Sequence, residues 1–378
     1  MPIACRIRRL HLSDFRTYTA SEMEVGSALV ALVGDNGAGK TNVLEALSLL
    51  AQGRGLRRAD LADMARRSGD GSFAVAVEAE GGLGPCHLGT GVIAGETGRR
   101  NRINREPASS PIAFADHLRI VWLTPDQDGL FRAAAGERRR FLDRLVLAVD
   151  PAHAARVSAL ERALRARNRL LEEFAPDRHW LDAAEHEVAE IAVAVAAARR
   201  ETVDRLAHLI ATGRDEASVF PYPVLTLEGA LEERIAAEPA SAVEDWYRAE
   251  LAAGRARDKA AGRTLTGPQA SDLAVRHGPK DMPARLCSTG EQKALLIALV
   301  LAHARLVTAM TGMAPITLLD EVAAHLDPGR RRALIGALGA LGGQVWLTGA
   351  DPSLTDDLHA SADCFAVTPG HIMPIVAS

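Results

Sequence analysis

The sequence lacks most features that mark secreted, membrane or zinc-binding proteins. Its 378 residues include only four cysteines, which are scattered without a CxxC pair or a histidine cluster at metal-ligand spacing. Neither a disulfide framework nor a zinc site is therefore predicted. The N-terminal segment has no apolar stretch long enough for a signal peptide, and the most apolar run, 294–304, is too short to cross a bilayer. We expect a cytoplasmic protein with reduced thiols and no membrane partner.

Aromatic residues are also scarce, and positive charge is not in excess. Aromatic side chains make up 4% of the chain, which argues against a platform that stacks single-stranded bases. The formal net charge is -4, so no global positive field indicates a nucleic-acid partner, and any such partner would require a local basic face. Hydrophobic residues make up 48% of the sequence, enough for at least one full core.

Apolar patterns predict strands at both ends of the chain and helices in the middle. Strands are expected over 7–12, 28–33, 73–78, 117–123, 316–319 and 344–347. Helices are expected over 43–50, after Gly290 and from Pro328, whereas the residues after 347 are expected to form only a short tail. The alternation favours an α/β fold with a strand-rich N-terminal lobe.

A change of composition between residues 137 and 213 predicts an insertion. This stretch is rich in Ala, Arg and Glu, and its apolar residues recur every three to four positions. We expect a helical hairpin broken near Pro176, followed by a further helix over 242–260. The predicted domains are one discontinuous head, 1–136 with 262–378, and an inserted helical arm, 137–261.

A glycine-rich loop supplies the strongest functional signal. The sequence from Gly34 to Thr41 matches GxxxxGK[ST], preceded by an apolar strand and followed by an amphipathic helix. In such loops the backbone amides and the helix N-terminus bind phosphates, the lysine reaches the β- and γ-phosphates, and the Thr hydroxyl binds Mg²⁺. The predicted ATP-binding residues are Gly34, Asp35, Asn36, Gly37, Ala38, Gly39, Lys40 and Thr41.

A second signal is the pair Asp320-Glu321 at the end of the strand 316–319. Alone, the pair has a second interpretation as the solvated start of a helix. Together with the phosphate loop, it predicts Asp320 in the magnesium shell and Glu321 polarising the water that attacks the γ-phosphate. Asp327 follows a few residues later.

A third segment, 287–293, carries the sequence Cys-Ser-Thr-Gly-Glu-Gln-Lys ahead of a helix. Locally it is also typical of a helix cap. With the Asp-Glu pair and Leu326-Asp327, it resembles the signature of ABC-type ATPases, whose serine and glycine contact the γ-phosphate held by the opposite subunit. The resemblance implies an ATP-dependent homodimer in which Ser288, Gly290, Gln292 and Asp327 complete the nucleotide site. It also implies that Gln127 senses magnesium and that Thr348 is a switch near the γ-phosphate.

The spacing between Lys40 and Ser288 is longer than transporter ATPases have, and with the helical insertion it resembles the SMC-like DNA-repair branch. Within that branch the chain is similar to the RecF family, through the opening 12–18, the segment 41–46 and the Arg-rich segment 137–143. The resemblance implies that Arg16 and Asn42 contact the nucleotide. It also implies double-stranded, gapped or junction DNA, recombination mediator proteins as partners, and weak ATP hydrolysis that serves as a release switch. The chain departs from the family at Gln269, where a histidine is usual.

Arginine clusters in the first half of the chain are the candidate DNA contacts. Such clusters are otherwise solvated faces or ion pairs, and this alternative stays open. The predicted DNA-binding residues are Arg54, Arg57, Arg58, Arg66, Arg67, Arg138, Arg139 and Arg140.

Other functions compatible with these motifs are an SMC- or RecN-like repair ATPase, a transporter ATPase subunit, and an ATPase-linked nuclease. The transporter requires membrane-domain partners, and the long insertion argues against it. The nuclease requires a further carboxylate-rich domain.

Overall fold

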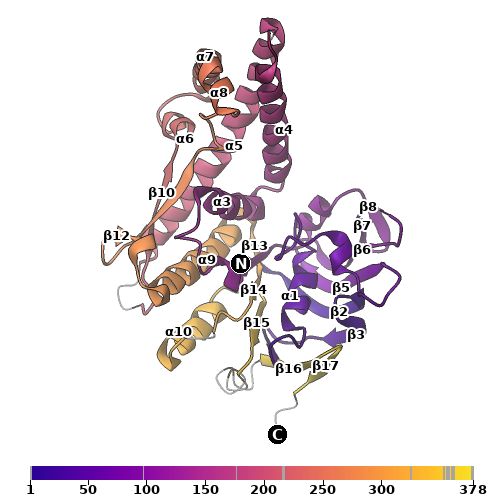
Figure 1. Cartoon of the computed structure of the whole chain (residues 1–378). Helices are drawn as coiled ribbons and strands as arrows, with labels where there is room; N and C mark the ends of the chain where they lie inside the picture. The colour runs from indigo at the N-terminus through magenta and orange to yellow at the C-terminus, as the bar shows by residue number, and fades with distance from the viewer. Residues whose placement is uncertain are drawn as a thin grey trace. The chain divides into compact units, whose positions relative to one another are not determined.

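The computed structural model describes residues 2–96, 98–175, 177–214, 218–323, 326–351, 354, 358 and 362–375 (Figure 1). Its backbone packing divides the chain into two compact units. The first comprises Met1–Asp128, Ala217–Phe220 and Leu296–Ser378, and the second comprises Gly129–Glu216 and Pro221–Leu295. The four cysteines are free thiols, as predicted.

A six-stranded sheet of order β17-β16-β4-β15-β14-β9 lies at the centre of the first unit. The strands are β4 (Leu29–Val33), β9 (Ile120–Leu123), β14 (Ile316–Leu319), β15 (Val345–Gly349), β16 (Ala362–Thr368) and β17 (His371–Pro374). All neighbours are parallel except β16 and β17. The four predicted strands of this sheet are short apolar runs, typical of parallel strands buried on both faces. Because they are parallel, their carboxyl ends meet at one edge.

A second six-stranded sheet forms the predicted N-terminal lobe, in the order β3-β2-β5-β6-β7-β8. Its strands are antiparallel: β2 (Arg6–Phe15), β3 (Tyr18–Glu24), β5 (Phe73–Gly81), β6 (Gly84–Val92), β7 (Arg100–Ile103) and β8 (Glu106–Ala108). Burial alternates along β5, so that one face meets the core and the other meets solvent. Smaller elements of this unit are β1 (Ile3–Ala4) with β13 (Met313–Ala314), α2 (Leu61–Met64), and the 3₁₀ helices η1 (Pro111–Asp116) and η2 (Pro125–Gln127).

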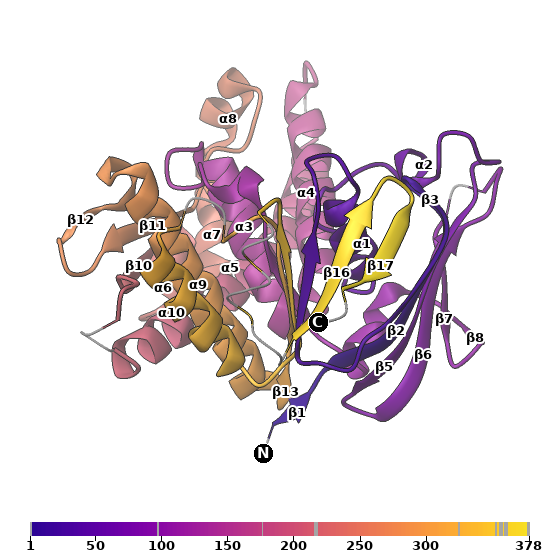
Figure 2. The ribbon, with the colours of Figure 1, turned by 90° about the horizontal axis from the view of Figure 1, so that it is seen from below.

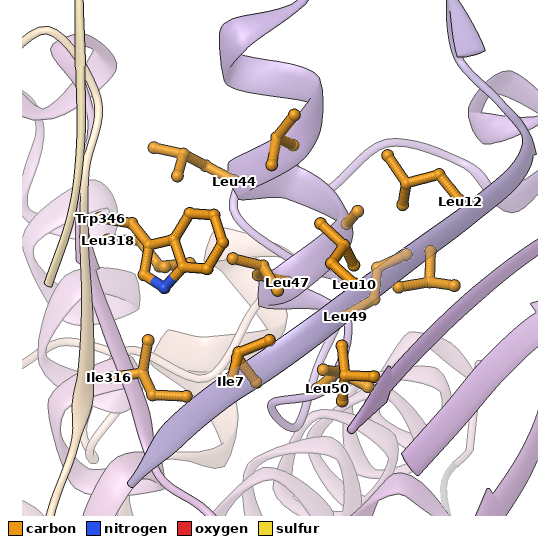
Figure 3. Close-up of a cluster of buried hydrophobic side chains, with 14 of the residues drawn as sticks. Ile7, Leu10, Leu12, Leu44, Leu47, Leu49, Leu50, Ile316, Leu318 and Trp346 are labelled. Carbon is orange, nitrogen blue, oxygen red and sulfur yellow. The ribbon is translucent and has the colours of Figure 1, made fainter. Parts of the chain in front are cut away.

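Helix α1 (Lys40–Ser48) packs in the core of the first unit. Figure 3 shows Leu44 and Leu47 of α1 near Trp346 of β15 and Leu10 of β2, and all four side chains are fully buried. The Trp346 indole donates to Gln344 Oε1 at 3.0 Å. This packing fixes α1 rigidly, and with it the loop that leads into α1.

The second unit is mostly helical, as predicted. It contains α3 (Ala135–Val149), α4 (His153–Glu172), α5 (Arg178–Thr212), α6 (Ala230–Ile235), α7 (Ala240–Ala253) and α8 (Arg255–Ala261). The expected helical hairpin is α4 with α5, which pack along each other. Pro176, the predicted break between them, lies outside the described residues.

Arg167 anchors the helices of the second unit through buried polar contacts. Its fully buried guanidinium contacts the Glu185 carboxylate at 3.1 Å and the Asp258 carboxylate at 2.8 Å. It also donates to the carbonyl of Leu251 at 2.7 Å. A buried arginine is tolerated because carboxylates and a carbonyl satisfy its donors, so these contacts tie α4, α5, α7 and α8 together.

Helix α9 (Thr289–Thr311) continues from the second unit into the first, and α10 (Pro328–Gly339) belongs to the first. By length and composition α9 could span a membrane, with a mean hydropathy of 1.9 in its most apolar window. However, 67% of that window is buried inside the protein, as in the core helices of many proteins.

Three elements differ from the expectations. The expected tail is instead the hairpin β16–β17, which lies beside β4 and β3 (Figure 2). A small sheet, β10 (Pro223–Glu228), β11 (Asp272–His277) and β12 (Met282–Pro283), followed by η3 (Ala284–Leu286), brings strands into the second unit. The helix expected over 242–260 is interrupted at Gly254, which ends α7 and begins α8.

Candidate nucleotide-binding site

The loop between β4 and α1 has the geometry of a phosphate loop. Gly34 has φ 157° and lies so close to β16 that a Cβ would sit 2.2 Å from the carbonyl oxygen of Val367. Gly39 has φ 114°, and its carbonyl accepts the Tyr18 hydroxyl at 3.0 Å. Both positions therefore require glycine. Asp35, Asn36 and Gly37 are exposed at the loop, whereas Ala38 is buried beneath it.

Lys40 folds back onto the loop that precedes it. Its side chain is buried, and Nζ donates to the carbonyls of Gly34 at 2.6 Å and Asp35 at 2.9 Å. The ammonium group thus lies across the loop that curls around a phosphate. Phosphate oxygens are stronger acceptors than carbonyls, so an anion in the loop would compete for the same protons.

Three strand ends meet beside the loop. The hydroxyl of Thr41 donates to the carboxylate of Asp320, at 2.9 Å to Oδ1 and 3.0 Å to Oδ2. Thr348, at the end of β15, donates to the same Oδ1 at 2.8 Å and accepts the backbone N–H of Glu321 at 2.9 Å. The structure thus brings together four predicted site residues from α1, β14 and β15.

The two carboxylates have different surroundings. Asp320 is buried, and burial raises its pKa, although the hydrogen bonds from Thr348 and Thr41 oppose this. Glu321 is half-buried and has φ 50°, a left-handed conformation that is costly for a residue with a Cβ. Strain of this kind persists where the surrounding structure fixes the residue, and here the contact with Thr348 does so.

The oxygen donors at this edge suit a magnesium ion. Gln127 ends η2 just after β9, and its Oε1 is buried without a hydrogen-bond partner among the described residues. β9 pairs with β14 in parallel, so Gln127 follows the strand next to Asp320. Thr41, Asp320 and Gln127 would offer a hydroxyl, a carboxylate and an amide oxygen, which are hard ligands of the kind Mg²⁺ prefers. Phosphate oxygens of a bound nucleotide would complete the coordination shell.

A polar network extends from the loop along α1. The fully buried carboxylate of Glu45 accepts two hydrogen bonds from Arg16, at 2.6 and 2.7 Å, and one from Arg57 at 2.9 Å. Arg57 also donates to Asn42 Oδ1 at 2.8 Å, and Asn42 Nδ2 donates to Thr17 at 3.1 Å. The predicted nucleotide residues Arg16 and Asn42 are thereby joined to Arg57, which the sequence had suggested for DNA.

This network forms one wall of a cavity of about 1210 Å³ in the first unit. The cavity is large enough for a nucleoside. Its other walls come from the segment 59–71 and from the turn at Pro369 and Gly370 in the C-terminal hairpin. Four arginines line it against one aspartate, which favours an anionic or polar ligand. The four are Arg16, Arg57, Arg66 and Arg67.

The predicted signature turn lies in the second unit. Ser288 directly precedes α9, Gly290 is exposed in its first turn, and Gln292 is buried. Gln292 Nε2 donates to the carbonyl of Cys287 at 2.7 Å, so this side chain fixes the turn from inside. Arg132 donates to the same carbonyl at 3.1 Å and was not identified from the sequence.

Asp327 is the N-cap of α10, and its Oδ1 accepts the backbone N–H of Arg330 at 2.9 Å. This contact and the nearby Arg330 guanidinium hold the pKa of the Asp327 carboxyl below its usual value. No contact joins Asp327 to the Thr41–Asp320 cluster within the described residues.

Most of the predicted DNA arginines are ion-paired, which was the alternative interpretation of the clusters. Arg57 pairs with Glu45, and five of the eight are paired in all; the other four pairs are Arg54 with Asp60, Arg66 with Asp14, Arg138 with Asp272, and Arg140 with Glu137. Arg139 donates to the carbonyl of Ser271 at 2.6 Å. Only Arg58 and Arg67 of the eight are exposed without an ion pair to any described residue.

The signals that sequence reasoning missed are long-range contacts. Tyr18, Glu45 and Arg132 support the site through partners 12 or more residues away, which no local motif reveals. Gln269, where the family usually has histidine, donates to the carbonyls of Thr264 and Thr266 at 3.3 and 2.8 Å. It ties its own loop within the second unit.

Fold and site together define a P-loop ATPase head of the ABC type. Residues 6–368 match the family model of the RecF/RecN/SMC N terminal domain. The DNA replication and repair protein RecF of Mesorhizobium japonicum is 51% identical over 376 residues, which cover 99% of both chains. The chain therefore belongs to the RecF family.

Solved structures agree with this assignment at the level of the fold. A structure of the recombination mediator protein RecF-ATP in the RecFOR pathway has a TM-score of 0.83 at 20% identity, covering 99% of this chain and 100% of that one. The Smc head domain derived from Pyrococcus furiosus has a TM-score of 0.55 at 16% identity, covering 99% of this chain and 96% of that one.

Proposed function

We propose that the protein binds ATP with Mg²⁺, closes into a homodimer on ATP, and acts on DNA as a recombination and repair mediator. The observation that carries this proposal is the cluster of Thr41, Asp320 and Thr348, which links the phosphate loop, the acidic strand end and the switch strand. The names of the relatives support it, since they are DNA replication and repair proteins and one solved relative is a RecF-ATP structure.

Within this proposal each side chain has a role that follows from its position. Lys40 and the amides of 34–41 bind the β- and γ-phosphates. Thr41, Asp320 and Gln127 hold Mg²⁺, which when bound neutralises charge on the phosphates. Glu321 orients and deprotonates the attacking water, and Thr348 keeps Glu321 in place through its backbone. Ser288 and Gly290 of a second copy complete the site from the far side of the γ-phosphate.

We assign Arg57 to the nucleotide and not to DNA. Its guanidinium is held by Glu45 and Asn42 on the first turns of α1, and its charge makes a minor contribution against the rise in the pKa of the Asp320 carboxyl. A cation at this position sits where it can bind the phosphates or the ribose. Arg16 and Thr17 then face the nucleoside in the 1210 Å³ cavity.

We assign phosphate contacts with DNA to Arg58 and Arg67. Both are exposed, both follow arginines that are already paired, and Arg58 adopts φ 54°, which sets its side chain apart from that of Arg57. Binding to the DNA phosphate backbone through a few cations would be sensitive to salt and would show little preference for DNA sequence. The preferred DNA form, duplex or gapped, and the mediator proteins are carried over from the family.

Sedimentation in ATP tests the proposal. Wild type and Glu321→Gln are compared with Lys40→Ala in saturating ATP or ADP, with and without gapped DNA. We expect an ATP-dependent dimer for wild type, a longer-lived one for Glu321→Gln because γ-phosphate cleavage is blocked, and monomers for Lys40→Ala. Monomers for both wild type and Glu321→Gln in ATP would exclude the dimer.

Two related proposals complete the assignment. The functional head is 1–136 with 262–378 and the arm is 137–261, whereas the backbone packing places 129–136 and 262–295 in the second unit. The protein works in the cytoplasm without a membrane partner. An SMC- or RecN-like repair ATPase remains the second candidate, because the Smc head shares the fold. Stimulation of ATP hydrolysis by gapped DNA over blunt duplex would favour the RecF-type role.

A further inference from the structure

The serine of the signature turn is held in a closed hydrogen-bond ring. The hydroxyl of Ser288 donates to Glu291 Oε2 at 2.9 Å, and the backbone N–H of Ser288 donates to the same oxygen at 2.9 Å. The N–H of Glu291 donates back to Ser288 Oγ at 3.4 Å. This is a capping box, which satisfies the free amides at the start of α9. Because a hydroxyl has one proton, that of Ser288 is committed to Glu291.

Lys280 adds a charge to this ring. It lies in the turn between β11 and β12, and its ammonium group pairs with Glu291 Oε1, while the Ser288 contacts use Oε2. Lys280 first, and then the Ser288 amide, lower the pKa of Glu291 to about 2. Glu291 is therefore anionic at neutral pH, and each of its two oxygens has its own partner.

These contacts conflict with the role proposed for Ser288. To bind the terminal phosphate on a second copy, the hydroxyl has to turn its proton away from Glu291. The anionic carboxylate one helical turn along then faces a phosphate of the same sign, which opposes closure. Lys280 acts against both effects, because it draws the carboxylate toward its own side and offsets the negative charge.

We propose that the Lys280–Glu291 ion pair regulates closure of the ATP dimer, by setting how readily Ser288 is released to the partner's γ-phosphate. Glu291 restrains the serine and Lys280 relieves that restraint. Both are positioning residues that act through Ser288. This inference rests on the proposed function, since it concerns the regulation of the same nucleotide site.

A double-mutant cycle on dimerisation tests the proposal. The variants Lys280→Met, Glu291→Gln and their combination are made in the Glu321→Gln protein, so that hydrolysis does not blur the equilibrium, and dimerisation is measured by sedimentation in saturating ATP. We expect Lys280→Met to weaken the dimer roughly five- to tenfold, because it leaves an uncompensated carboxylate opposite a phosphate. Glu291→Gln should strengthen the dimer by a similar factor, and Lys280→Met should change it less than about twofold once Glu291 is glutamine.

Controls separate this role from general electrostatics and from folding. Arg276→Met removes a cation from the same hairpin, where Arg276 pairs with Asp281 at 2.8 Å, and should leave the dimer unchanged. Lys280→Arg should restore dimerisation, and ATP binding to the monomer should be the same in all variants, since Lys40 is untouched. Lys280 and Glu291 are both partly exposed, so the variants should fold.

The outcomes distinguish this inference from the proposed function. Lys280→Met could weaken the dimer equally in the protein with Glu291 and in the protein with Glu291→Gln. That result would show that Lys280 acts on the phosphate directly, and it would overturn the proposed restraint of Ser288 by Glu291. A dimer insensitive to either substitution would overturn it as well. Absence of any ATP-dependent dimer in the starting protein would instead remove the proposed function itself.

Discussion

At the scale of single residues, Glu232 carries a buried carboxyl group that lacks hydrogen bonds within the described part of the chain. It is fully buried in α6, and neither of its oxygens has a hydrogen-bond partner among the described residues. Burial raises its pKa above the usual 4.5. The Glu232 backbone amide, the Ser271 hydroxyl and Arg199 lie near the carboxyl without hydrogen-bonding to it, and they offset this rise only in part. Glu232 is therefore protonated in the folded protein over a range in which the unfolded chain is ionised.

The raised pKa of Glu232 predicts a stability that falls with pH. The protonated Glu232 carboxyl contributes to the free energy of unfolding. This contribution is fully present below the unfolded pKa of 4.5 and is lost as the pH rises through the pKa of the folded protein. Glu232→Gln keeps the shape and removes the titration. Its free energy of unfolding should exceed that of wild type by roughly 1–3 kcal/mol at pH 8, with little difference at pH 4.5.

Urea unfolding at several pH values measures this difference. Glu190→Gln, an exposed position on α5, is the matched control and should follow the wild-type curve. Parallel pH profiles for wild type and Glu232→Gln would contradict the buried titration.

At the scale of secondary-structure elements, the C-terminal hairpin supports the phosphate loop. Asp363 of β16 accepts the backbone amides of Gly26 and Ser27 at 2.7 and 2.8 Å, and the Ser27 hydroxyl at 3.0 Å. Gly34 of the loop also lies against the carbonyl of Val367 on the same strand. The hairpin thus fixes both the start of β4 and the loop at its end.

We expect Asp363→Ala to loosen this hairpin and weaken nucleotide binding. Loss of three hydrogen bonds, two of them from backbone amides, should lower the free energy of unfolding by roughly 1–3 kcal/mol. Hydrogen exchange should rise in 362–374, and ATP affinity should fall, whereas His371→Ala, on the exposed edge strand, should change neither. Unaltered exchange in β16 with unaltered ATP affinity would show that the hairpin is not a support.

The same elements show what the sequence was able to predict. The strands 28–33, 117–123, 316–319 and 344–347 are short, apolar and next to glycine or acidic residues, so local pattern was sufficient to place both them and the loop 34–41. The hairpin β16–β17 has apolar residues in both strands, but its place beside β4 is fixed by Asp363 and by its pairing with β4, far away in sequence. The strand β10 is likewise fixed by its pairing with β11. Partners distant in sequence leave no local signal.

At the scale of the whole molecule, the net charge of -4 does not reveal which cations are paired within the fold. Most arginines in the predicted clusters neutralise carboxylates within their own unit, Arg57 at Glu45 and Arg138 at Asp272 among them. An ion-paired arginine gives up its partner before it can bind a phosphate, so it contributes little to DNA affinity. Local composition alone cannot separate ion-paired arginines from arginines that are available to a phosphate, because pairing depends on residues brought together by the fold.

This distinction predicts opposite phenotypes for neighbouring arginines. Arg58→Ala with Arg67→Ala should weaken duplex binding at every sequence tested, and should lower the slope of log affinity against log salt by about 2, since two phosphate contacts release their counterions. ATP affinity should stay unchanged in Arg58→Ala alone, because Arg58 does not line the 1210 Å³ cavity whereas Arg67 does. Arg57→Ala should do the reverse, because Arg57 is bound to Glu45 and Asn42 beside the nucleotide site: ATP binding should weaken and the salt slope of DNA binding should hold.

Fluorescence anisotropy on a labelled duplex over a salt series, with ATP affinity measured in parallel, distinguishes the two phenotypes. If the double substitution leaves the salt slope intact while Arg57→Ala lowers it, then ion pairing within the fold is a poor guide to the DNA surface, and Arg57 contacts DNA as its sequence context first suggested.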